Sequence, residues 1–384
     1  MKKMLMVASM GSMLAQFNIE NMKILIELGY KVDVAANFTD VDPMSHERRK
    51  KLFDFFKEEN IKYFQIDFSR GIGSVSGNLK AYSQLNKVIM NNKYDFIHTH
   101  SPLASVITRI SAKKNNVPVL YTAHGFQFFR GGSFKDWVIF YPIEYFFSKY
   151  TDGIITINNE DFKRAKKMNS KKVYYIPGVG VNTRKYGMTS ENGKFNKIRI
   201  EFSLGMDTTI LLSVGELSKR KNHEVIIRAM ATMKELDIVY FICGVGQEET
   251  KLRELVQTLN LNEKVKLLGY RTDIDEVMSY SDIFVFPSKR EGLGLAAIEA
   301  MAAGLPIITS NVNGINDYSI DGVTGYSYSP NDYKGFAKGI KMLINNKEIF
   351  GKMKINNKNA AVKYDIANVN KNMKEIYEQY TKEK

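Results

Sequence analysis

Residues 283–310 place a strand, a glycine loop, a helix and a second strand in immediate succession, and this unit constrains the fold more than any other stretch. The apolar run 283–287 has the length and the β-branched and aromatic content of a buried strand. Gly294 then allows the backbone to turn tightly and to approach a ligand closely. Residues 295–303 are rich in Ala, Leu, Met and Glu and predict a helix, and the β-branched run 307–309 predicts the next strand. The sequence therefore predicts a β-loop-α-β unit.

The same alternation of buried strands and helices runs along the chain in two series. The first series ends near Pro177, where PGVGVNTRKYG has the turn residues of an interdomain segment. Because 384 residues are many for a single core, we expect two domains. The predicted strands are 3–9, 31–36, 61–66, 95–99, 119–122, 153–157, 209–214, 238–243 and 265–268. The predicted helices are 14–28, 48–59, 78–91, 103–114, 137–150, 222–233, 248–259, 273–278 and 367–380.

The fold class that follows is α/β, with two Rossmann-like, doubly wound domains that face a central cleft. In such folds ligands bind outside the carboxyl ends of the strands. The loop that begins at Glu291 lies at such an end, shortly after the predicted strand 283–287. We therefore expect a ligand at this loop.

The start of the helix after this loop is suited to a diphosphate. A helix N-terminus offers unpaired backbone N–H groups and a partial positive charge, here at Gly294 and Leu295. Glu291 lies just before the helix and Glu299 about a turn and a half inside it, so an acid flanks the phosphate position on each side. A nucleotide sugar has this layout, with hexose hydroxyls at one end and ribose hydroxyls at the other, and carboxylates accept hydrogen bonds from hydroxyls. Spacing alone fits two solvated helix acids equally well.

The pattern E-x7-E in the setting PSKREGLGLAAIEAMAAGLPII resembles the donor site of the retaining GT-B glycosyltransferases of family 4. The segments YDFIHTHSP, YTAHGFQFFRGG, YTDGIITINNED and YIPGVGV are similar to the subgroup of that family found in bacterial exopolysaccharide and capsule clusters. The resemblance implies that Glu291 contacts the hexose of the donor, Glu299 its ribose, and the segment at Gly294 and Leu295 its diphosphate.

The resemblance also implies a division of labour along the chain. We expect an acceptor-binding domain over residues 1–182 and a domain over residues 183–363 that binds the nucleotide-sugar donor. A terminal helix, within residues 364–384, is expected to pack back on the first domain.

Three cations in GELSKRKN, residues 215–222, lie between a predicted strand and a predicted helix. There they are suited to neutralise a departing diphosphate, although a solvated basic turn is the other interpretation. Family 4 commonly carries Arg after the first glycine of this segment and Lys five residues later. This chain keeps Lys221 but has Glu216 at the arginine position. We therefore take Arg220 as the substitute donor-binding residue.

His124 follows a predicted strand, and the next residue is a glycine that lets the backbone approach a ligand. The family has a His-Gly pair beside the reacting sugar, so His124 and Glu291 are the predicted catalytic residues. Without the resemblance, a lone His at a strand end is usually a packing residue. The resemblance likewise implies that Gly11, in a predicted turn, meets the donor phosphates.

A metal site is conceivable at His98 and His100, which alternate along a predicted strand and so share a face. The sequence offers no third ligand, and retaining GT-B chemistry generally needs no metal. We therefore expect neither a metal nor another cofactor.

The net charge of +14 is concentrated in the first half of the chain. Residues 1–185 hold 28 Lys or Arg against 16 Asp or Glu, whereas the rest holds 27 against 25. A one-sided basic domain indicates a polyanionic partner such as nucleic acid, an anionic membrane face or a phosphorylated lipid. The segment 124–150 interleaves aromatic residues with Arg130, Lys135 and Lys149, as an interfacial segment does, although an aromatic core helix fits equally well. No nucleic-acid-binding module surrounds it, so we expect an anionic membrane surface and no nucleic acid.

The N-terminus imitates a signal peptide, but Met13 is too large for the cleavage rule and the following residues continue a helical pattern. The single cysteine, Cys243, excludes an internal disulfide and suits a reducing compartment. We expect a cytoplasmic protein that associates peripherally with the inner face of the cell membrane.

The expected reaction moves a sugar with retained configuration from an NDP-sugar, in particular a UDP-sugar, to a polyprenyl-diphosphate-linked saccharide or similar acceptor in cell-surface polysaccharide synthesis. Three alternatives stay open. The chain could be a GT-B nucleotide-sugar epimerase, a non-enzymatic basic RNA-binding protein, or an inactive donor-binding partner of another transferase.

Overall fold

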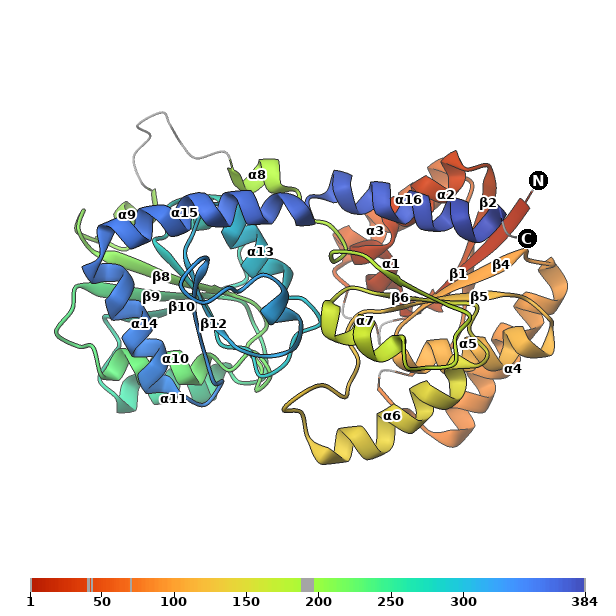
Figure 1. The fold of residues 1–384 in the computed structure, drawn as a ribbon, viewed down its shortest axis with the longest axis horizontal. Coiled ribbons are helices and arrows are strands. Elements are labelled where there is room, and N and C mark those ends of the chain that lie inside the picture. The colour runs from red at the N-terminus through yellow and green to blue at the C-terminus, as the bar shows by residue number, and fades with distance from the viewer. Residues whose placement is uncertain (1, 40–41, 43, 70, 188–196, 383–384) are drawn as a thin grey trace. The chain divides into compact units, whose positions relative to one another are not determined.

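The computed structural model of the chain describes residues 2–39, 42, 44–69, 71–187 and 197–382, and it divides into two compact units (Figure 1). The first unit contains Met1–Val179 and Val369–Lys384, and the second contains Gly180–Asn368. The chain therefore passes from one unit to the other twice. The first passage lies within the segment PGVGVNTRKYG.

The first unit is built on a seven-stranded parallel sheet with the strand order β3-β2-β1-β4-β5-β6-β7. Its central strands are the apolar runs that the sequence predicts, and β4 and β5 are buried along their whole length. The order reverses beside β1, because the chain adds β2 and β3 on one side and β4 to β7 on the other. The strands are β1 Lys2–Met10, β2 Tyr30–Asn37, β3 Lys62–Gln65, β4 Phe96–His100, β5 Val119–Ala123, β6 Gly153–Thr156 and β7 Lys172–Tyr175. The helices are α1 Gly11–Phe17, α2 Ile19–Glu27, α3 His46–Glu58, α4 Val75–Asn92, α5 Pro102–Lys114, α6 Phe134–Ser148, α7 Asn159–Ala165 and α16 Ile366–Lys382.

The second unit repeats this plan with a six-stranded parallel sheet in the order β10-β9-β8-β11-β12-β13. Here the order reverses between β8 and β11, and the apolar faces of helices α10 and α14 cover part of the core. The strands are β8 Thr209–Val214, β9 Ile238–Cys243, β10 Val265–Gly269, β11 Ile283–Phe286, β12 Ile307–Ser310 and β13 Gly325–Tyr328. The helices are α8 Thr183–Gly187, α9 Lys197–Glu201, α10 His223–Ala231, α11 Glu249–Thr258, α12 Ile274–Ser279, α13 Leu295–Ala302, η1 Asn313–Asp317, α14 Tyr333–Asn345, α15 Lys347–Ala361 and η2 Val362–Tyr364. Two doubly wound α/β units are the architecture that the sequence predicts.

The helix predicted over residues 14–28 is in fact two helices, α1 and α2, which are separated at Asn18. Asn18 leaves the helical backbone conformation, with φ −127°, and its buried amide donates to the carbonyl of Met13 at 3.3 Å. Short polar side chains compete in this way with helical hydrogen bonds. The predicted turn at Gly11 is also wrong, because Gly11 is the first residue of α1.

The last helix, α16, is attached to the sheet of the first unit through a buried histidine of β4. The hydroxyl of Tyr377 lies 2.8 Å from Nδ1 of His98, and the hydroxyl of Thr122 lies 2.8 Å from Nε2. Burial, with a smaller contribution from His124, lowers the pKa of His98 to about 3. The ring is therefore neutral at ordinary pH, and both of its nitrogens are hydrogen-bonded.

We predict that replacing His98 with Gln makes the stability of the protein less sensitive to acid. Below its ordinary pKa of 6.5, His98 takes up a proton in the unfolded state but not in the folded state. Its contribution to stability is therefore fully present above pH 6.5 and is lost as the pH falls toward the folded pKa. The free energy of unfolding, measured by urea titration, should fall less steeply in acid for the variant, by about 1.4 kcal/mol per pH unit.

The control for this measurement is the same change at His46, which is exposed on α3. His46→Gln should leave the slope as it is in the wild type. If His98→Gln and the wild type have equal slopes, a neutral buried ring at His98 is excluded.

Candidate active site

The predicted donor residues of the second unit come from two loops that meet where the strand order reverses. Arg220 and Lys221 follow β8, Glu291 and Gly294 follow β11, and these two strands are neighbours in the sheet. The backbone N–H of Lys289 donates to the carbonyl of Arg220 at 2.8 Å and joins the loops. Open α/β sheets bind ligands at such a switch point. Topology therefore brings together residues that are about seventy positions apart in the sequence.

The carboxylate of Glu291 is the centre of this cluster. Glu291 is only 7% exposed, and its Oε1 lies 2.7 Å from both Nη1 of Arg220 and Nζ of Lys221. Burial raises the pKa of Glu291, but the charges of Lys221 and Arg220 outweigh this effect and hold the pKa below its ordinary value. One buried anion thus faces two cations. The cluster has a net positive charge, which suits an anionic ligand.

Among the three cations of GELSKRKN, the structure separates the two that approach Glu291 from the one that does not. Lys219 is exposed, as is Glu216 at the position where the family commonly has Arg. Lys221 is largely buried, its Nζ lies 4.6 Å from the ring centre of Phe286, and burial lowers its pKa. Arg220, the predicted substitute, therefore lies in the cluster together with Lys221.

The residue that precedes helix α13, Gly294, occupies a position that only glycine can occupy. Gly294 has φ +93°, and a Cβ added there would lie 2.6 Å from the ring of Phe286 and 2.9 Å from the hydroxyl of Tyr318. The N-cap residue makes no side-chain hydrogen bond to the first turn of the helix, which includes the backbone N–H of Leu295. The hydroxyl of Tyr318 is buried and has no hydrogen-bond partner within the described residues. These groups can bind an anion from the protein side.

A third loop, which was not predicted from the sequence, completes this part of the site. It contains η1 and follows β12, and the backbone N–H of Gly314 donates to the carbonyl of Glu291 at 3.2 Å. A Cβ on Gly314 would lie 1.9 Å from the carbonyl oxygen of Gly292, so the two loops touch through their backbones. Tyr318 comes from the end of this loop. The available signal was the Asn-Gly pair soon after a predicted strand, a turn signature at a carboxyl edge.

Glu299 lies in the second turn of α13 and is half-buried. Burial raises the pKa of its carboxyl, while a hydrogen bond from Tyr186 and the charge of Lys185 oppose the rise. Tyr186 and Lys185 belong to α8, in the segment predicted as an interdomain hinge. Glu299 could be predicted from the sequence, whereas Tyr186 could not.

In the first unit, His124 comes directly after β5 and contacts a second histidine. Nε2 of His124 lies 3.1 Å from Nδ1 of His100, and the His124 ring lies 5.4 Å from that of Phe17. Burial lowers the pKa of His124 to about 4. His124 is therefore neutral at ordinary pH, so one ring nitrogen can donate a hydrogen bond and the other can accept one. Gly11 is buried beside Phe38, whose ring would be 2.6 Å from an added Cβ.

The possible metal site at His98 and His100 has no support in the part of the chain that the structure describes. Both nitrogens of His98 are already bonded to hydroxyl groups, and no group of three His, Cys, Asp or Glu residues among the described residues could hold a metal ion.

The segment 124–150 has features of both structures that its sequence left open, an aromatic core element and an exposed apolar and basic segment. Phe126, Phe128 and Phe129 are buried, and Trp137 packs against the ring of Phe128. By contrast, α6 carries strongly exposed apolar residues, and Arg130 and Lys135 are exposed beside its start. The segment is thus a core element on one side and an apolar, basic surface on the other. None of the described helices combines the length and the apolar character that crossing a membrane requires.

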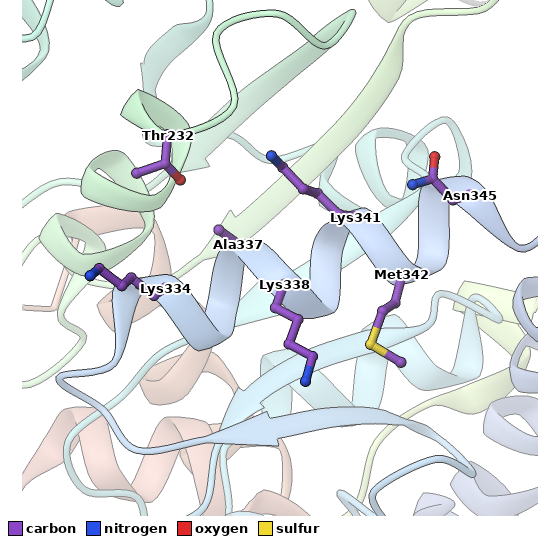
Figure 2. A pocket seen from close by; sticks show the side chains of 7 residues that line it. All are labelled: Thr232, Lys334, Ala337, Lys338, Lys341, Met342 and Asn345. Atoms are coloured by element: carbon purple, nitrogen blue, oxygen red, sulfur yellow. The ribbon is translucent and has the colours of Figure 1, made fainter.

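A separate hollow of about 590 Å³ lies along α14 and carries none of the predicted site residues (Figure 2). In Figure 2, Lys338 and Lys341 point to opposite sides of the helix, so the cations do not converge on one position. Lys341 is also paired with Glu235 at 3.1 Å. We assign no ligand to this hollow, which is lined by Thr232, Lys334, Ala337, Lys338, Lys341, Met342 and Asn345.

Comparison with known sequences identifies the family. The profile described as Glycosyltransferase Family 4 matches residues 19–184, and the profile described as Glycosyl transferases group 1 matches residues 194–360. The putative glycosyltransferase EpsD of Bacillus subtilis (strain 168) is 32% identical over 396 residues, which cover 100% of this chain and 99% of EpsD. The UDP-Gal:alpha-D-GlcNAc-diphosphoundecaprenol alpha-1,3-galactosyltransferase of Escherichia coli is 30% identical over 305 residues, which cover 77% of this chain and 78% of that protein.

Comparison with solved structures identifies the fold. The structure of Anabaena Alr3699/HepE in complex with UDP matches with a TM-score of 0.77 and 18% identity, over 99% of this chain and 100% of that chain. The agreement extends over both α/β units, which together form the GT-B architecture. On the strength of its full-length relative and this fold, the chain belongs to glycosyltransferase family 4 and is a GT-B glycosyltransferase.

Proposed function

We propose that the chain transfers a sugar, with retained configuration, from a UDP-sugar to a polyprenyl-diphosphate-linked saccharide in the synthesis of a cell-surface polysaccharide. The observation that carries the donor half of this proposal is the pairing of Glu291 with Arg220 and Lys221 beside the uncapped start of α13. The acceptor half rests on the E. coli relative, whose name specifies a GlcNAc-diphosphoundecaprenol acceptor. The Anabaena structure contains UDP, which supports a uridine nucleotide as the donor.

The diphosphate of the donor is assigned to the cations and the helix start. In the reaction, the bond between the anomeric carbon and a diphosphate oxygen breaks, and its electron pair leaves with UDP. Lys221, Arg220 and the N–H groups of Gly294 and Leu295 would stabilise the charge that develops on this leaving group. The oxygen of the acceptor hydroxyl bonds to the anomeric carbon, and the proton that this hydroxyl loses is taken up by the departing diphosphate oxygen. Because two protein cations can supply this charge compensation, we propose that the reaction needs no metal.

The sugar and ribose ends of the donor are assigned to the two acids. Glu291, held ionised by its cations, would accept hydrogen bonds from hexose hydroxyls, and Glu299, beside Tyr186, would do the same for the ribose. His124, which is neutral, would help to orient the sugar, and Gly11 would lie near the donor phosphates. These roles follow the family pattern residue by residue.

An anionic membrane surface is the proposed meeting place with the acceptor. Arg130 and Lys135 are exposed next to the apolar surface of α6, and this combination suits lipid headgroups. The basic excess of the first half of the chain supports the same partner, on the cytoplasmic face of the membrane.

The direct test of the function is to incubate the protein with a UDP-sugar, with and without a polyprenyl-diphosphate-linked saccharide. We expect an extended saccharide that retains the anomeric configuration and forms only when the acceptor is present. A free epimer formed from the donor alone would favour the epimerase alternative instead. Binding of UDP-sugar without any product, across several sugars and acceptors, would favour an inactive partner.

We predict that Glu291→Gln separates nucleotide binding from transfer. The change keeps the size of the side chain but removes the acceptor charge, so transfer should fall by about 10²-fold or more. Affinity for UDP should stay the same or rise, because Arg220 and Lys221 lose the anion that offsets them. Calorimetry with UDP and a transfer assay measure the two effects. Unchanged turnover, with Glu263→Gln at an exposed surface acid as the control, would remove Glu291 from the site.

We predict that Arg220 and Lys219 differ in their effect on UDP binding. Arg220→Ala should weaken binding by about tenfold, because a charge-assisted contact to phosphate is lost. Lys219→Ala, one residue earlier and exposed, should change it little. Thermal-shift titration with UDP compares the two variants directly. Equal losses would mean that the loop acts only through its overall charge.

A further inference from the structure

A cavity of about 340 Å³ in the first unit has no role in the donor site described above. It lies where the strand order reverses between β1 and β4, with Ser9 at the end of β1 and Ser101 just after β4 in its lining. Its volume is within the range of small-molecule sites, and ligands in such sheets bind at the reversal. Ser101 directly follows His100, so the cavity adjoins the histidine pair of the same unit.

The walls of this cavity are apolar and come from three separate elements. Ile72 precedes α4, Leu103 and Val106 belong to α5, and α6 contributes Ile139 and Ile143. Because these side chains offer no hydrogen bonds, they fit a hydrocarbon chain better than a sugar or a nucleotide.

Three polar side chains of the lining, Ser9, Ser101 and Glu144, are already hydrogen-bonded within the protein. The hydroxyls of Ser9 and Ser101 are 3.0 Å apart. The buried carboxylate of Glu144 accepts from Nη2 of Arg109 at 3.0 Å and from the hydroxyl of Tyr121 at 3.1 Å. Glu144 is the one charged side chain among the described residues of the lining, and its charge is compensated by Arg109.

The backbone at Ser101 is strained. Its φ of +73° and ψ of +138° lie in a region that residues with a side chain rarely adopt, yet a serine is held there. Strain of this kind persists only where the surroundings enforce it, and it gathers at ligand sites. The strain is an observation independent of the cavity walls, and it marks the same position.

The mouth of the cavity is continuous with an exposed apolar surface on α6. Ile139 and Ile143 line the cavity and are also 37% and 40% exposed. Further out on α6, Phe134 is 83% exposed and Phe146 is 49% exposed. Apart from Lys135, Asp136 and Glu144, helix α6 consists almost entirely of apolar and aromatic residues, and the exposed cations Arg130 and Lys135 lie at its start. The apolar path thus leads from the switch point to a surface suited to a membrane.

We propose that this cavity holds the first isoprenoid units of the lipid-linked acceptor, and that the rest of the chain leaves along α6. The inference rests on the proposed function, because it assigns a place to the acceptor of that reaction. The diphosphate and saccharide then lie toward the carboxyl edge of β4 and β5, on the side of His100 and His124. Recognition of the acceptor is thereby divided between its lipid and its sugar.

The test compares two probes, farnesyl diphosphate and inorganic diphosphate, by calorimetry with the full-length protein. Wild type should bind farnesyl diphosphate at least about tenfold more tightly, because the isoprenoid chain buries apolar surface. Val106→Phe, which narrows the cavity, should abolish this difference. Val362→Phe, the same change at an exposed valine of the second unit, should preserve it. Equal binding of both probes to wild type, or a farnesyl preference that survives Val106→Phe, overturns the proposal.

A second variant keeps the test decisive if Val106→Phe fails to fold. Because Ile143 is partly exposed, Ile143→Thr removes apolar contact without overfilling the core, and it should lower the farnesyl preference about threefold. An unchanged preference again overturns the proposal. The proposal is also overturned if sedimentation velocity shows a dimer that Ile143→Thr dissociates. In that case the apolar surface of α6 binds a second copy of the chain.

The cavity and the proposed function can fail separately. The same saccharide is presented on a farnesyl diphosphate and on a methyl diphosphate, and transfer to each is followed. If neither is extended while farnesyl diphosphate still binds in a Val106-dependent way, the proposed function fails and the cavity assignment stands. If both are extended with equal KM, and Val106→Phe changes neither value, the cavity assignment fails and the proposed function stands.

Discussion

One oxygen atom of Glu291, shared by Arg220 and Lys221, holds the second unit's ligand loops together. The three side chains come from the loops after β8 and β11, and all are at least partly withdrawn from water. Two cations, of which Lys221 is largely buried and Arg220 partly exposed, face this one anion, so the three side chains together carry a net positive charge. An anionic ligand that supplies the missing charge therefore also stabilises the loops, so binding and local order at this switch point are linked.

Most of the fold could be predicted from the sequence because the central strands of both sheets are buried on both faces and form apolar runs. The two strands that were missed, β7 and β13, each lie at one edge of their sheet, whereas the opposite edge strands, β3 and β10, were predicted. Their sequences KVYY and GYSY are short and partly polar, and β7 is half-buried throughout, so periodicity gives no clear signal there. The break at Asn18 was missed for a related reason, since the apolar pattern continues across it while a single side-chain hydrogen bond redirects the backbone.

The site could be predicted only as far as local sequence signals extend. Glu291, Gly294 and Lys221 stand beside strand ends with glycines, which is a readable pattern. Tyr318 and Tyr186 have no such signal, because sheet topology and a short helix bring them beside Gly294 and Glu299 from other parts of the chain. The sequence could not choose between adjacent cations either. The structure distinguishes them by exposure, since Lys219 points to solvent and Arg220 reaches the carboxylate.

The backbone contact between the loop of Gly314 and that of Gly292 limits what evolution can change here. Neither Gly314 nor Gly294 has space for even a methyl group, so these two positions beside the start of α13 tolerate almost no substitution. Sequence changes in related proteins must then occur at exposed positions around these loops, for example at Lys289. A family with this geometry can therefore vary the exposed side chains around these loops while the backbone at the start of α13 stays the same.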